Sequence, residues 1–179
     1  TLIAIEPQQK LAECIERTMQ ENGKNIRWRV VNAAVGSHES TAHIVIPNDN
    51  FGEAHLTQNT IHASQVSSPI QVTTLDILLD DIKQFSKIIV KIDVEGYEMD
   101  VLNGGRKFLS SARPIIILEI NPTTMRRYNY STVELRNTLI SLGYTHWRMC
   151  GQKHGYHSIQ NLPDQYCDIV LYTDIPAAQ

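Results

Sequence analysis

The sequence predicts an α/β fold with a doubly wound, mostly parallel sheet, and three observations lead to that fold. Strand patterns alternate with helix patterns along the chain. The runs at residues 88–93 and 114–120 are apolar almost throughout, which is typical of parallel strands covered on both faces. No repeat, low-complexity tract or linker divides the 179 residues, which are enough for one core. We therefore expect a single domain over residues 1–179.

The N-terminal half is expected to alternate strands with two helices. Apolar residues at helical spacing predict a helix over residues 8–22, which Gly23 ends, and a brief helix follows at residues 75–81. Residues 47–68 are polar and show no period, so we expect a long loop there. Short apolar or β-branched runs predict the strands of this half, which are residues 2–5, 26–31, 41–46 and 70–73.

The C-terminal half has a similar alternation. A helix is expected over residues 98–109, although two adjacent glycines weaken its second half. A second helix begins at a cap, either Ser131 or Thr132, and runs to Leu142 before Gly143 ends it. The strands expected in this half are residues 88–93, 114–120, 145–149 and 168–172.

Two carboxylates, spaced two residues apart, stand at the end of the central apolar strand. Asp93 and Glu95 precede Gly96, and a carboxylate at such a point costs free energy unless something uses it. Ligands of open α/β sheets bind just outside the carboxyl ends of the strands. We therefore expect Asp93 to act on a ligand, the alternative being a cap for the helix near Glu98. Gly96 is expected to allow a positive φ or a close approach of the backbone to a ligand.

Other acids near this strand have two interpretations each. Glu95 and Glu98 follow Asp93 closely enough for the charges to raise one another's pKa, which suits a general base. The same oxygens could ligate a divalent cation, but we assign no metal site from the sequence. The alternative is that Glu98 is an acid of the first helical turn and only Glu95 faces the site. Glu119 and Asn121 end the next apolar strand, where they either line an acceptor pocket or form a turn.

Two positions in the N-terminal half are candidates for binding a nucleoside. Glu6 ends the first strand, where a carboxylate can accept two hydrogen bonds from a ribose diol. The alternative is an acid stabilised by the dipole of the following helix. Ala33 lies in a turn of small residues, where an adenine ring can lie against the backbone, and simple turn packing is the alternative.

A glycine-rich turn after the first strand, which a doubly wound nucleotide-binding sheet requires, is missing. We therefore expect that residues 1–179 lack a natural N-terminal portion with the first strand and its glycine loop. The alternative, a chain that is whole, would leave apolar strand edges exposed.

Composition excludes several classes of function. A net charge of -3 and scattered basic residues give no reason to expect nucleic acid or a membrane as a partner. Three cysteines without metal-ligand spacing argue against a disulfide framework and a zinc site. No apolar run approaches the length of a membrane span, and no signal peptide is visible. We therefore expect a cytoplasmic protein.

Three blocks of sequence resemble the FkbM family of methyltransferases, which use S-adenosylmethionine. The resemblance covers most of the chain, from Leu2 to about Met149, and the order and spacing of the blocks also fit. The blocks are Ala4–Pro7 with Leu11; Val72–Asp76 with Val90–Glu98 and Val101–Gly105; and Arg113–Ile120. The middle block is the specific one.

The resemblance implies a class I methyltransferase fold, with S-adenosylmethionine as cofactor and methyl donor. It implies O-methylation of a hydroxyl on a sugar or natural-product small molecule, so the partner is a small-molecule or glycan acceptor. Glu6 and Ala33 would then bind the donor, while Asp93 would contact both the donor and the acceptor. Asp93 and Glu95 are the catalytic candidates, with Glu95 the next candidate for proton removal. The missing first strand and glycine loop depart from the family pattern.

Two other functions remain open at this stage. A non-catalytic relative would keep the same blocks and serve as a binding or scaffold module. An NAD-dependent oxidoreductase would use Glu6 for the ribose of NAD. Neither the acceptor nor the oligomeric state is encoded in a motif, because acceptor pockets are built from loops.

Overall fold

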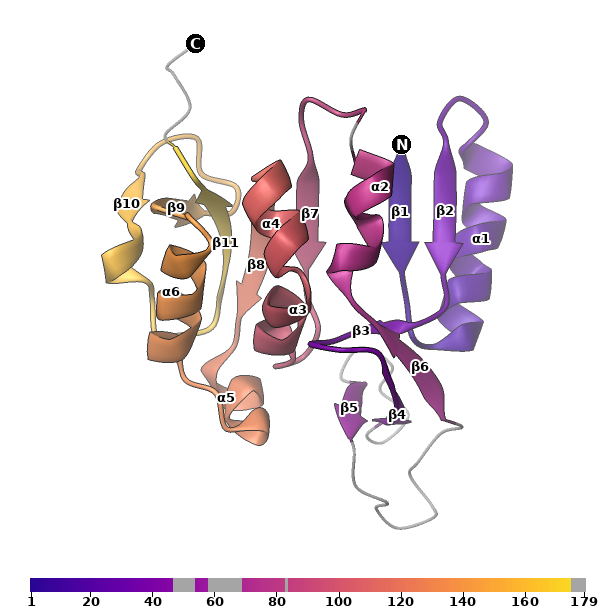
Figure 1. Ribbon diagram of the computed structural model, residues 1–179, viewed down its shortest axis with the longest axis horizontal. Coiled ribbons are helices and arrows are strands. Elements are labelled where there is room, and N and C mark those ends of the chain that lie inside the picture. Colours follow the sequence, from indigo (N-terminus) through magenta and orange to yellow (C-terminus); the bar gives the residue numbers. More distant parts are fainter. Residues whose placement is uncertain (47–53, 58–68, 83, 175–179) are drawn as a thin grey trace. The chain divides into compact units, whose positions relative to one another are not determined.

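The computed structural model describes residues 1–46, 54–57, 69–82 and 84–174 of an α/β protein (Figure 1). The chain divides into two compact units, Thr1–Thr74 and Leu75–Gln179. Each unit has its own hydrogen-bonded strands and its own helices. A single domain over residues 1–179 stays a prediction. Among the described helices, none has the length and apolar character that crossing a membrane requires.

The unit Thr1–Thr74 contains one described helix and two sheets. Strands β1 and β2 pair in parallel, and a second, mixed sheet has the order β3-β6-β4-β5. Ala34, Ala42 and Val72 form a small core on this second sheet. The elements are β1 (Leu2–Ile5), α1 (Gln9–Asn22), β2 (Trp28–Val31), β3 (Ala34–Val35), β4 (Ser40–Val45), β5 (His55–Thr57) and β6 (Ile70–Thr73).

Helix α1 ends where the sequence predicts it, at Gly23. The backbone N–H of Gly23 donates to the carbonyl of Met19 at 2.7 Å and closes the last turn. A Cβ on Gly23 would lie 2.5 Å from that same oxygen, so a larger residue would push the helix end apart. Glycine therefore ends this helix because of close backbone contact.

The unit Leu75–Gln179 is built on a five-stranded sheet with the order β10-β9-β11-β8-β7. Its strands are β7 (Ile89–Ile92), β8 (Ile115–Ile120), β9 (His146–Met149), β10 (His157–Ser158) and β11 (Cys167–Tyr172). Its α-helices are α2 (Leu79–Ile82), α3 (Glu98–Gly104), α4 (Arg106–Ala112), α5 (Pro122–Met125) and α6 (Thr132–Ser141). Short 3₁₀ turns are η3 (Leu75–Leu78), η4 (Arg126–Tyr128) and η5 (Ile159–Asn161).

The predicted doubly wound, mostly parallel sheet is not confirmed, because the sheets are mixed. Strands β7 and β8 pair in parallel, as the two apolar runs indicate. Strand β11 is antiparallel to both β8 and β9, and β9 is antiparallel to β10. An apolar run indicates a strand but does not fix the direction of its neighbours. The burial on both faces expected of residues 88–93 is not observed in β7, where Ile89 is exposed and Ile92 is buried.

The core of this unit lies between the sheet and the helices on one of its faces. Figure 1 shows α3, α4 and α6 in front of the strands. The alternate residues Ile116, Leu118 and Ile120 of β8 are completely buried, whereas Ile115 at the start of the strand is exposed. This period of two follows from the pleat, which turns successive side chains to opposite faces.

The helix predicted over residues 98–109 is two helices. It breaks at Gly105, where a Cβ would lie 3.0 Å from side-chain atoms of Leu75. The cap predicted for the next long helix is confirmed at Ser131. Its hydroxyl accepts from the backbone N–H of Glu134, and the Glu134 carboxylate accepts from the N–H of Ser131, which is a capping box.

Candidate functional site

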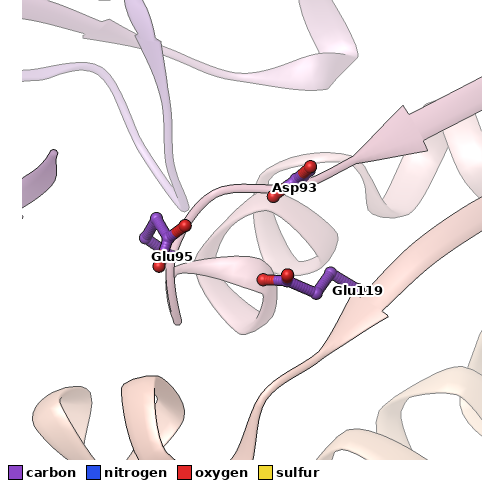
Figure 2. A group of neighbouring side chains, drawn as sticks. All are labelled: Asp93, Glu95 and Glu119. Atoms are coloured by element: carbon purple, nitrogen blue, oxygen red, sulfur yellow. The ribbon is translucent and has the colours of Figure 1, made fainter. Parts of the chain in front are cut away.

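Three carboxylates gather at the carboxyl ends of the two parallel strands (Figure 2). Asp93 follows β7 directly, and Glu119 lies near the end of β8. Ile92 pairs with Leu118 across these strands, so the next residues in the same register are Asp93 and Glu119. Glu95 joins them from the turn after β7. One oxygen from each carboxylate lies within 4.8 Å of the others.

The turn that carries Glu95 has an unusual backbone. Glu95 has φ 53 and Gly96 has φ 100, so two consecutive residues lie in the left-handed region. A non-glycine residue pays roughly 1 kcal/mol for that conformation. A Cβ on Gly96 would lie 2.4 Å from the carbonyl oxygen of Thr124. The positive φ expected of Gly96 is therefore confirmed, and its lack of a Cβ admits the chain's own backbone at Thr124.

Asp93 does not cap the following helix. The N-cap of α3 is Tyr97, and no side chain donates or accepts a capping hydrogen bond there. The Asp93 carboxylate instead pairs with the ammonium group of Lys91, and 41% of the Asp93 side chain is exposed. This ion pair raises the pKa of Lys91. Asp93 is thus held by one cation and stays accessible.

Glu98 is completely buried in the first turn of α3, although the sequence-based interpretation treats it only as a possible base or helix-start acid. Its Oε1 accepts from the backbone N–H of Gly96 at 3.0 Å, and its Oε2 has no partner among the described residues. Burial raises the pKa of Glu98 to about 7. The hydrogen bond between Glu98 and Gly96 therefore stabilises the turn that carries Glu95.

Glu119 is the buried member of the three, with 8% of the residue exposed. Its Oε2 accepts no hydrogen bond from the described residues. Burial raises the pKa of Glu119, and the negative charge of Asp93 raises it further, while the Tyr166 hydroxyl lowers it. Asn121, by contrast, caps α5, since its side chain accepts from the backbone N–H groups of Thr123 and Thr124.

In the unit Thr1–Thr74, Glu6 stands at the carboxyl end of β1. Its Oε1 accepts from the backbone N–H of Gln8 at 2.7 Å. Burial raises the pKa of Glu6, and this hydrogen bond lowers it. Asn32 fixes the same corner by donating to the carbonyls of Glu6 and Pro7. Ala33 follows and is buried, with 5% exposed.

Comparison with known proteins identifies the type of domain. The family model described as the methyltransferase FkbM domain matches residues 1–157. The chain is also similar in fold to the crystal structure of methyltransferase FkbM from Methylobacillus flagellatus KT, with a TM-score of 0.54 and 18% sequence identity. The similarity covers 95% of this chain and 36% of that one, so the chain spans about a third of the solved protein. No match exists among the curated proteins compared with the chain.

Proposed function

Because the chain belongs to the FkbM family of methyltransferases, we propose that it methylates a hydroxyl oxygen of a sugar or another small natural product, with S-adenosylmethionine as donor. The match of the family over residues 1–157 is the observation that carries this proposal. The acids at the carboxyl ends of β7 and β8 support it, because ligands of α/β sheets bind at that edge.

Glu6 is the residue that we propose for the ribose of the donor. Its Oε1 accepts from the backbone N–H of Gln8 at 2.7 Å. A carboxylate fixed in this way keeps one oxygen ready for a diol hydroxyl and loses little freedom on binding. Ala33 is the residue that we propose for the adenine, because a small side chain in this turn would let a flat ring approach the backbone.

When bound, the donor supplies a methyl group on a positively charged sulfur. The protein's part is to hold an acceptor oxygen in line with that methyl group and to remove the proton of the hydroxyl. We assign the first task to Asp93, which is accessible at the end of β7. Glu95, whose carboxylate is the next one along the turn, would take the proton of that hydroxyl. The sulfur–carbon bond of the donor would break as the oxygen–carbon bond forms, and S-adenosylhomocysteine would leave.

Substitution of Asp93 by Asn tests this reaction directly. Purified protein is given donor labelled in the methyl group and a panel of hydroxylated acceptors, and label in the product is counted. We expect Asp93→Asn to lower kcat by a factor of about 100 or more, within the usual range for positioned acid–base groups.

Asp174→Asn is the matched control, because it removes an exposed carboxylate of the same unit outside the three-carboxylate group. Its turnover should equal that of the wild type. Wild-type turnover in Asp93→Asn would show that Asp93 has been assigned the wrong role. A wild-type protein that neither labels an acceptor nor binds S-adenosylhomocysteine would refute the proposed function as a whole.

A further inference from the structure

The three-carboxylate group of Asp93, Glu95 and Glu119 concentrates negative charge around a small volume. Ligand oxygens from all three side chains lie within 4.8 Å of one another (Figure 2). Asp168 adds to the charge, because it pairs with Glu119 across β8 and β11. The ammonium group of Lys91 pairs with Asp93.

Glu119 provides an observation that an exposed acidic surface does not. It is more than nine-tenths buried, and its Oε2 accepts no hydrogen bond from the described residues. Its carboxylate points toward those of Asp93 and Glu95 in Figure 2. A buried anionic oxygen without a partner is costly, and folded proteins satisfy such atoms with a hydrogen-bond donor, water or an ion.

We propose that Asp93, Glu95 and Glu119 together bind a divalent cation that prefers oxygen ligands. Carboxylate oxygens suit Mg²⁺, Ca²⁺ and Mn²⁺ rather than metals that select nitrogen or sulfur. Two oxygens on opposite sides of Ca²⁺ lie about 4.6–5.2 Å apart, and on opposite sides of Mg²⁺ about 4.0–4.2 Å. The oxygens of this group lie within 4.8 Å of one another, so an inward movement of less than about 1 Å brings them to the ligand distances of such an ion.

The protein can bind the cation whether or not it transfers methyl groups. The role of the cation described next, which is to hold the acceptor, rests on the proposed function. Three protein carboxylates leave coordination positions open on an ion with six or more ligands. A hydroxyl oxygen of the acceptor can occupy one of them, and a cation there favours loss of the hydroxyl proton. The acceptor class that this site prefers is then one with two neighbouring oxygens, because such a pair can chelate the ion.

Titration with Mn²⁺, followed by the loss of the electron paramagnetic resonance signal of the free ion, tests the site. We expect the wild-type protein to bind one Mn²⁺ per chain and to release it to an excess of Ca²⁺ or Mg²⁺. Glu119→Gln and Glu95→Gln should each weaken Mn²⁺ binding at least tenfold. Glu16→Gln is the matched control, since it removes an exposed carboxylate on α1, and it should bind as the wild type does.

Thermal unfolding supplies a second readout. The wild-type protein should gain several degrees in Tm with saturating Mn²⁺, because the ion binds only the folded state. Glu119→Gln should have the higher Tm without metal, since it relieves the charge repulsion, and should gain less than the wild type at the same Mn²⁺ concentration.

The proposal is wrong if the folded wild-type protein shows no saturable Mn²⁺ binding, or if both Gln variants bind as tightly as the wild type. A parallel titration with S-adenosylhomocysteine, without divalent ions, separates the two proposals. Mn²⁺ binding without S-adenosylhomocysteine binding would leave the cation site standing and remove the methyltransferase function. Binding of S-adenosylhomocysteine without binding of Mn²⁺ would refute only the cation site.

Discussion

Glu98 holds a carboxyl group in the interior beside the site, and this location makes stability depend on pH. Its pKa is raised from 4.5 to about 7, mainly by burial. Between these two values the folded state binds more protons than the unfolded state, so the free energy of unfolding falls as pH rises from about 4.5 to about 7. The change that Glu98 contributes is about 3 kcal/mol.

We predict that Glu98→Gln flattens this part of the pH dependence. The amide keeps an oxygen for the N–H of Gly96 but cannot ionise, so the variant gains stability relative to the wild type as pH rises. Urea unfolding of both proteins at pH 5 and pH 8 measures the difference. Glu16→Gln, an exposed acid, should keep the wild-type pH dependence. If the free energy of unfolding of Glu98→Gln fell between pH 5 and pH 8 as much as that of the wild type, Glu98 would not be the group responsible for the pH dependence.

At the scale of residues, the sequence predicts part of the site. Asp93 and Glu95 can be found because carboxylates rarely follow a buried strand without a use. The burial of Glu98 is missed, although a signal exists. Glu98 precedes Leu102 by four residues, and Leu102 is completely buried, so both lie on one face of the helix. The raised pKa of Glu119 depends on its three-dimensional neighbours, which sequence spacing does not give.

At the scale of elements, the backbone at Gly96 packs closely against the backbone of helix α5. We predict that Gly96→Ala destabilises the protein by about 3 kcal/mol or more, because φ is positive and the new Cβ would meet the backbone of Thr124. Gly143→Ala is the control, since Gly143 has φ +90 with open space around it and should lose only about 1–2 kcal/mol. Chemical denaturation measures both losses, and equal losses would show that the contact with Thr124 relaxes at little cost.

Strands that form a continuous run between turn residues are predicted well, and the shortest elements are not. Strands β1 and β6 have the predicted bounds, because each is a continuous run between turn residues. Strands β3 and β10 have two residues each, and β5 has three, so none is long enough to show a period. Helix α5 is missed for the same reason, although Asn121–Pro122 is a cap followed by proline at N1.

At the scale of the whole molecule, the family follows from the sequence and the reaction is our proposal. The three blocks around Glu6, Asp93 and Glu119 resemble the family whose model matches residues 1–157. The same blocks do not predict which strands are antiparallel. The direction of a strand relative to its neighbour depends on the path that the chain takes between the two strands. The acceptor remains a proposal, since loops rather than motifs build acceptor pockets.

Calorimetric titration of S-adenosylhomocysteine into the purified protein tests the central claim most directly. We predict micromolar binding to the wild type, at least tenfold weaker binding to Glu6→Ala, and wild-type binding to the exposed control Glu13→Ala, with NAD unable to compete. Absence of binding to the folded wild-type protein, or displacement by NAD, would contradict donor recognition and with it the proposed methyl transfer.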